Sequence, residues 1–212
     1  MQNLDSYGQR NHSGIDESGK GDYFGALAVS GVYLPLAKVE EVRGWGVRDS
    51  KGIADNVALR LAAVIEDNLV HHSIVYDPPQ YNERYGRFNN LNHLLADAHA
   101  QIIAALMAKT ACANVISDKF ASSAALIPSY LPSGCSPRLL QITKAERDLA
   151  VACASVVARA NFLRSLQRLA ATHGMKFPKG ASNQVKAQAR QLRQRYGARM
   201  LAQVAKVHFK MD

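Results

Sequence analysis

The chain carries near its N-terminus the stretch Gly14-Ile15-Asp16-Glu17-Ser18-Gly19-Lys20-Gly21-Asp22-Tyr23-Phe24-Gly25, and an apolar run from Ala26 to Leu34 follows it directly. The apolar run is rich in Val, Leu and Ala, which is typical of a buried strand. A short lead-in from His12 to Ile15 predicts a neighbouring strand, joined to the first by the glycine-rich loop. We expect the glycines to let the backbone turn just after Asp16, so that Glu17 lies beside it.

Two carboxylates held side by side repel each other unless they are protonated or bridged by a cation. The pattern therefore predicts a divalent metal site, although Asp, Gly and Lys are also common in solvated hairpins. A phosphate-binding loop is a second alternative, because Gly14 to Lys20 matches the first seven positions of that pattern. The next residue is Gly21, which lacks the hydroxyl that would bind magnesium. Acidic side chains inside such a loop would also repel the phosphates.

The composition is that of one globular domain with an excess of positive charge. The 212 residues are 48% hydrophobic and 20% charged, with a formal net charge of +9. This excess favours an anionic partner, and nucleic acid in particular. The cysteines and histidines show no zinc-ligand spacing, so a carboxylate metal site is favoured over a zinc site. With three unpaired cysteines and no apolar stretch expected to span a membrane, the sequence predicts a cytoplasmic protein without a membrane partner.

Apolar strands alternate with helical patterns along the chain, which predicts an α/β domain. We expect strands near 26–34, 72–76, 114–118 and 139–143, and helices near 56–68, 90–109 and 146–173, with a basic helix after residue 182. The segment 81–88 is predicted to be a loop. No linker divides the chain, so residues 14–212 are expected to form one domain behind a short N-terminal extension, residues 1–13.

Four carboxylates stand at the ends of predicted elements. Asp16 and Glu17 follow the first strand, Asp118 closes a later one, and Glu146 opens the long helix. Ligands of open α/β sheets bind where strand ends meet helix starts, so these side chains are expected to converge. Taken singly, Asp118 fits a turn, and Glu146 fits a capping box with Thr143. Together, in a basic protein, the four acids indicate a metal-dependent phosphodiester site.

The opening motif resembles that of the type 2 ribonucleases H, and among these it is most similar to ribonuclease HIII. Further matching motifs follow in the family's order: Tyr81-Asn82-Glu83, Asn90-Leu91-Asn92, Asp118-Lys119-Phe120-Ala121, Lys144-Ala145-Glu146, Pro178-Lys179-Gly180-Ala181 and the ending from Val204 to Phe209. The resemblance covers nearly the whole chain from Gly14 onward.

The resemblance implies an RNase H-like fold, with a five-stranded mixed sheet flanked by helices and with further helices at the C-terminus. It implies an endonuclease, a monomer, that hydrolyses the RNA strand of RNA–DNA hybrids. By motif position, the family's catalytic carboxylates correspond to Asp16, Glu17, Asp118 and Glu146. They would hold two Mg²⁺ or Mn²⁺ ions and leave 5′-phosphate and 3′-hydroxyl ends. A non-catalytic nucleic-acid-binding module with the same fold is the alternative.

The resemblance also implies substrate contacts. The residues Gly19, Lys20 and Gly21 occupy the position of a loop that senses the ribose 2′-hydroxyl in the HII branch, although Lys20 is typical of neither branch. Lys51 and Lys179 are expected to contact phosphates. His99 is expected to be an ordinary helix histidine outside the site. Ribonuclease HIII proteins usually carry an N-terminal substrate-binding domain, for which 13 residues are too few. We therefore expect either a weak, strongly salt-dependent affinity for long hybrids, or binding that rests on the catalytic domain's own charge.

Overall fold

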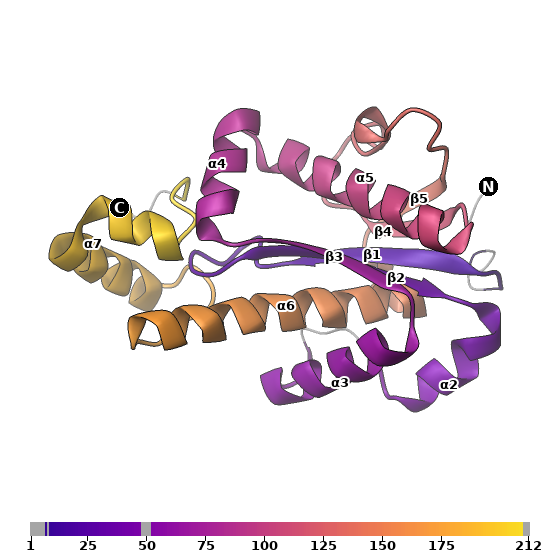
Figure 1. Cartoon of the computed structure of the whole chain (residues 1–212), viewed down its shortest axis with the longest axis horizontal. Coiled ribbons are helices and arrows are strands. Elements are labelled where there is room, and N and C mark those ends of the chain that lie inside the picture. The colour runs from indigo at the N-terminus through magenta and orange to yellow at the C-terminus, as the bar shows by residue number, and fades with distance from the viewer. Residues whose placement is uncertain (1–6, 8, 48–51, 210–212) are drawn as a thin grey trace.

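The computed structural model describes residue 7 and residues 9–47 and 52–209, and it is built on a five-stranded mixed sheet (Figure 1). The strand order is β3-β2-β1-β4-β5. The first three strands along the chain pair antiparallel, whereas β1, β4 and β5 run parallel. The predicted α/β class and five-stranded mixed sheet are confirmed. The strands are β1 (His12–Ser18), β2 (Leu27–Leu34), β3 (His71–Tyr76), β4 (Asn114–Asp118) and β5 (Arg138–Ile142).

Helices cover both faces of the sheet (Figure 1). One face of the sheet packs against α6, and α3 packs on α6 in turn; the other face packs against α5. Helix α7 lies beyond one end of the sheet with α4 beside it. The helices are α2 (Val39–Gly44), α3 (Asp55–Asn68), α4 (Pro78–Phe88), α5 (Leu91–Thr110), α6 (Leu149–His173) and α7 (Asn183–Val204), with short 3₁₀ turns at Leu36–Lys38, Pro128–Tyr130 and Ala145–Arg147.

The central core helix is α6. Its backbone approaches β1 so closely that a Cβ on Gly14 would lie 2.1 Å from the Val151 nitrogen, so only glycine fits at that position. Cys153 is fully buried in this helix, as its small-residue surroundings predict. Contrary to expectation, α6 is long and apolar enough by composition to cross a membrane, but 78% of its most apolar window is buried inside the protein. Its apolarity is that of a core helix.

The hairpin between β1 and β2 turns later than expected. β1 pairs with β2 as far as Ser18, opposite Ala28, and the left-handed residue that begins the turn is Gly19, with φ of 86°. The prediction of a turn just after Asp16 is therefore wrong, because ladder pairing keeps the strand extended for two more residues. Since the strand leads into a hairpin and not into a helix, the phosphate-binding-loop alternative is excluded.

Two helix boundaries also differ from expectation. The segment predicted as a loop near 81–88 belongs to α4, whose first turn accommodates two prolines behind a capping box made by Asp77 and Gln80. The long helix begins at Leu149 and not at Glu146, because the side chain of Asp148 caps it by accepting two backbone N–H bonds, each 3.0 Å long. Glu146 lies instead in the 3₁₀ turn before the cap.

The C-terminal segment returns to the β1–β2 hairpin. A β-bridge joins Phe24 to Ala205, and the ammonium of the fully buried Lys206 donates to the carbonyl of Gly25 at 2.7 Å. The loop before α7 is tied to the same hairpin, since the Gly180 N–H donates to Asp22 Oδ1 at 2.6 Å. The hairpin is therefore held from outside by residues that lie far from it in the sequence.

Candidate active site

The acidic residues lie at one edge of the sheet because three neighbouring strands run parallel. Ile15 of β1 pairs with Ser117 of β4, so Asp16 and Asp118 follow at the same edge. β5 pairs next to β4 and leads, four residues after Ile142, to Glu146. The carboxyl ends of parallel strands are the usual place for ligands in α/β proteins.

A cavity of about 430 Å³ opens at this edge. It is lined by Asp16, Glu17, Ser18, Gly19, Lys20, Gly21, Asp22, Asp118, Ser155, Arg159, Phe162, Leu163 and Lys179. The structure thus brings together three of the four predicted carboxylates and all the predicted substrate contacts except Lys51, which lies outside the described residues. Glu146 is half-buried and does not line the cavity, but its neighbour Ala145 donates a backbone N–H to Asp118 Oδ1 at 3.2 Å.

Asp16 points toward α6. Its Oδ1 atom accepts the Glu17 N–H at 2.8 Å, and Ser155 of α6 also bonds to its carboxylate. Burial, together with the negative charges of Glu17 and Asp118, raises the pKa of Asp16 to about 8, although these hydrogen bonds act in the opposite direction. The ionised form of this carboxyl is therefore unfavourable in the protein alone, and a bound cation would stabilise it.

Glu17 points to the opposite face of β1, toward α5, because side chains alternate along a strand. It does not swing beside Asp16 as expected. His99 Nε2 lies 3.5 Å from Glu17 Oε2, and Lys20 Nζ lies 3.6 Å from Oε1. Burial acts to raise the pKa of Glu17, but the hydrogen bonds and charges of His99 and Lys20 outweigh it and lower the pKa.

His99 is the functional side chain that sequence reasoning placed outside the site. It is fully buried, and its Nδ1 atom lies 3.0 Å from the Ser117 hydroxyl. The signal that would have found it is its position on α5, four residues after Leu95 and three before Ile102, on the apolar face of the helix. A histidine at such a core position needs a buried polar partner, and here that partner is a site carboxylate.

The donor set fits a hard divalent cation. Within the described residues, no three His, Cys, Asp or Glu side chains are already close enough to enclose an ion. However, the buried Glu17 Oε2 atom makes no hydrogen bond, and Asp16 is held in a place that disfavours its charge. Carboxylate oxygens are the ligands that Mg²⁺ and Mn²⁺ prefer. Bound divalent cations would supply the partner that Glu17 Oε2 lacks and would stabilise the ionised form of Asp16.

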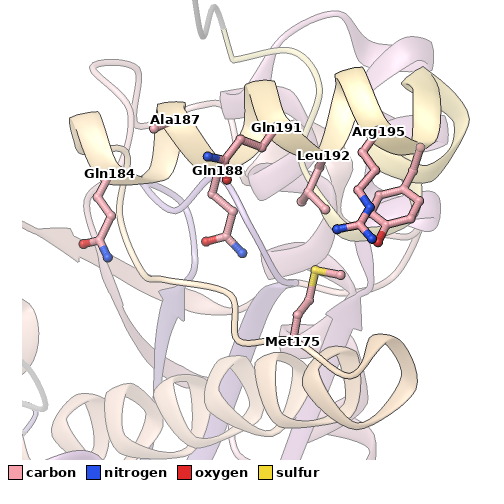
Figure 2. A pocket seen from close by; sticks show the side chains of 8 residues that line it. Met175, Gln184, Ala187, Gln188, Gln191, Leu192 and Arg195 are labelled. Carbon is pink, nitrogen blue, oxygen red and sulfur yellow. The ribbon is translucent and has the colours of Figure 1, made fainter.

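A different cavity, also of about 430 Å³, lies between α7 and Met175 (Figure 2). Three of its eight lining residues are glutamines, and Figure 2 shows Gln184, Gln188 and Arg195 reaching down from α7. No carboxylate is among the lining residues that the structure describes there, so this cavity lacks the ligands that a divalent cation needs.

The strand order, the mixed pairing and the acids at the parallel strand ends define the RNase H-like fold. Residues 13–212 match the model of the ribonuclease HII family, and the chain belongs to that family. It is 38% identical over 199 residues to the ribonuclease HIII of Protochlamydia amoebophila, an alignment that covers 94% of this chain and 66% of that protein. The chain spans about two thirds of the length of the curated relatives it matches.

Solved structures give the same similarity. A crystal structure of Bst-RNase HIII in complex with Mn²⁺ superposes with a TM-score of 0.87 at 31% identity, covering 96% of this chain and 68% of that one. RNase H3 of Aquifex aeolicus superposes with a TM-score of 0.81, also at 31% identity, covering 98% of this chain and 75% of that one.

Proposed function

We propose that this protein is an endonuclease that hydrolyses the RNA strand of RNA–DNA hybrids. The observation that carries the proposal is the placement of Asp16 and Asp118 at the ends of adjacent parallel strands, on a cavity with a basic rim. Relatives named ribonuclease HIII match this arrangement of elements over nearly the whole chain. The net charge of +9 suits a polyanionic substrate.

We infer that two divalent ions, Mg²⁺ or Mn²⁺, are held by Asp16, Glu17, Asp118 and Glu146. When bound, such ions activate a water molecule and stabilise charge on the leaving 3′ oxygen, which would give 5′-phosphate and 3′-hydroxyl products. The Mn²⁺ complex of Bst-RNase HIII supports this choice of metal. Glu146 lies in the 3₁₀ turn Ala145–Arg147 and would be the fourth ligand. The backbone N–H of Ala145 in the same turn donates to the Asp118 carboxylate.

The remaining groups of the site would bind and orient the substrate. The backbone of Gly19 to Gly21 lies at the cavity wall, where close approach to a ribose 2′-hydroxyl would distinguish RNA from DNA. Lys20 and Lys179 at the cavity, together with Lys51, would contact phosphates. We propose that the enzyme acts as a monomer in the cytoplasm.

A non-catalytic module with the same fold is the second candidate. The basic surface suits either function, but a pure binder gains nothing from acids buried beside a phosphate chain. Incubating a labelled RNA–DNA hybrid with Mg²⁺ and, separately, with Mn²⁺ separates the two candidates. Cleavage with 3′-hydroxyl ends is expected, and binding without cleavage under both ions would favour the module.

The variant D16N tests the assignment of the carboxylates. It should lower the cleavage rate by roughly 10³-fold or more, because the loss of a metal-binding charge removes the chemistry itself. D67N is the matched control, since Asp67 is an exposed carboxylate of α3 away from the cavity, and it should cleave like the unmodified protein. A fully active D16N protein would refute the proposed site.

A further inference from the structure

Two cations at the cavity share one carboxylate that does not line it. Asp55, in the first turn of α3, accepts a hydrogen bond from Arg159 Nη2 of α6 at 2.7 Å. The same carboxylate accepts from Lys179 Nζ at 2.9 Å on Oδ1 and at 2.7 Å on Oδ2. Arg159 and Lys179 both line the catalytic cavity, whereas Asp55 stands behind them.

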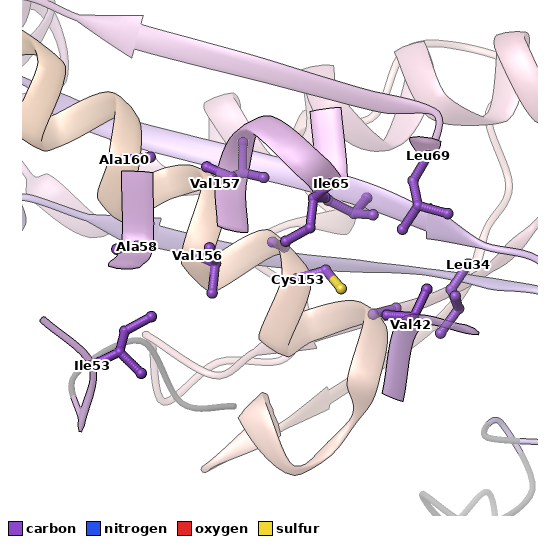
Figure 3. Close-up of a cluster of buried hydrophobic side chains, with 14 of the residues drawn as sticks. Leu34, Val42, Ile53, Ala58, Ile65, Leu69, Cys153, Val156, Val157 and Ala160 are labelled. Atoms are coloured by element: carbon purple, nitrogen blue, oxygen red, sulfur yellow. The ribbon is translucent and has the colours of Figure 1, made fainter. Parts of the chain in front are cut away.

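The position of Asp55 is set by the packing of α3 on α6. Figure 3 shows Ala58 and Ile65 of α3 in the same apolar cluster as Val156, Val157 and Ala160 of α6. Further along the two helices, Arg164 of α6 makes a bidentate pair with Glu66 of α3, with bonds of 2.7 and 2.8 Å. This packing fixes the position of α3 against α6, and it places the Asp55 carboxylate next to Arg159 and Lys179 beside the cavity.

Without the Asp55 carboxylate, the side chains of Arg159 and Lys179 would not remain close together. Both donate to the same carboxylate, so their like charges lie close to each other and repel. Arg159 is restrained by its burial in α6, with 17% of its side chain exposed, but the Lys179 side chain is 49% exposed on a loop. Removal of the anion would let Lys179 swing into solvent, away from the cavity.

We propose that Asp55 is a positioning residue, which holds Arg159 and Lys179 as a preformed pair for neighbouring phosphates of the substrate. This inference rests on the proposed function, because it takes the substrate to be a nucleic acid. The proposal also predicts that removing the Asp55 charge changes the affinity for the hybrid in the direction opposite to that expected from electrostatics alone. Removing a negative charge near a polyanion should strengthen binding by electrostatics alone, whereas loss of the preformed pair should weaken it.

The experiment compares D55N with D67N, which removes the same charge from an exposed residue of the same helix, away from the cavity. Binding of a labelled RNA–DNA hybrid is measured by fluorescence anisotropy without divalent ions, over a salt titration. D55N is expected to bind about tenfold more weakly, with a log affinity versus log salt slope smaller in magnitude by about 1 to 2, the loss expected for one or two phosphate contacts. D67N should match the unmodified protein in both quantities.

D55E, which keeps the charge on a longer side chain, should restore most of the slope, and thermal melting checks that each variant is folded. If D55N does not fold, D55S is compared with D55E in the same way. Binding by D55N equal to or tighter than that by D67N, with an unchanged slope, would overturn the role of Asp55. Binding of the hybrid without cleavage would defeat the proposed function alone, since this assay does not depend on hydrolysis.

Discussion

At the scale of single residues, His99 links the helical layer to the site. Its ring lies between the Ser117 hydroxyl and Glu17 Oε2 and is tilted against Phe120, with ring centroids 4.7 Å apart. The imidazole Nε2 and Glu17 Oε2 face each other at 3.5 Å, and neither atom makes a hydrogen bond of normal geometry to any described residue. His99 therefore fixes the direction of the Glu17 carboxylate, as outer groups do around metal ligands.

Replacing His99 by alanine should lower the rate of hybrid cleavage by about 10- to 100-fold, because Glu17 loses its orienting partner. The stability of the protein should fall by about 2 kcal/mol, since a buried side chain and its hydrogen bond are lost. Cleavage rates at saturating Mn²⁺ and thermal melting measure the two effects.

H93A is the control, because His93 lies on the same helix and its Nδ1 atom contacts the Tyr130 hydroxyl instead of the site. It should keep the cleavage rate of the unmodified protein. An H99A protein as active as H93A would show that His99 is only a packing residue.

At the scale of elements, the β1–β2 hairpin determines where the loop from Gly19 to Gly21 lies. The hairpin packs on α6, and the C-terminal segment and the loop before α7 hold it from outside. Gly19 has φ of 86°, and a Cβ there would lie 2.1 Å from the Ala26 carbonyl oxygen. The turn is therefore possible only with glycine at this position.

The variant G19A should destabilise the protein by about 2 kcal/mol or more, because alanine is strained at this φ and also clashes with backbone. G21A is the control within the same loop, since nothing lies within 4 Å of the Cβ it would add and its φ is not left-handed. Urea unfolding of the two variants measures the difference. Equal midpoints would contradict the argument from the turn.

At the scale of the whole molecule, a chain with an excess of positive charge gathers several acidic side chains at one cavity, next to Lys20, Arg159 and Lys179. The net charge is +9, yet Asp16, Glu17 and Asp118 meet at one sheet edge. Under the proposed function, the basic groups around the cavity would attract a polyanionic substrate, and the acids would hold cations next to its phosphates. The sheet thus places acidic and basic side chains around the same cavity.

Hybrid binding should accordingly be strongly dependent on salt. With about four phosphates contacted, through Lys20, Lys51, Arg159 and Lys179, affinity should fall about 10²-fold between about 50 and 200 mM salt. Anisotropy titrations measure this, and melting curves at each salt concentration show whether the protein stays folded. Affinity independent of salt would mean that the basic groups do not carry the binding.

The sequence by itself determined the features that depend on neighbouring residues. The apolar run of β2, the helical spacing of α5 and the small-residue face of α6 are local patterns, and each element lies close to its expected range. The motif around Asp16 and Glu17 indicated carboxylate chemistry and the family, because the spacing of such residues is itself local information.

Only the tertiary structure decided which side chains meet. The ladder to β2 extends β1 past Asp16 and so turns Glu17 toward His99, which lies 82 positions further along the chain. Asp55 contacts Arg159 and Lys179 across 104 and 124 positions. Contacts of this kind follow from strand register and helix packing, which arise from the whole core at once and leave no periodic pattern near the residues concerned.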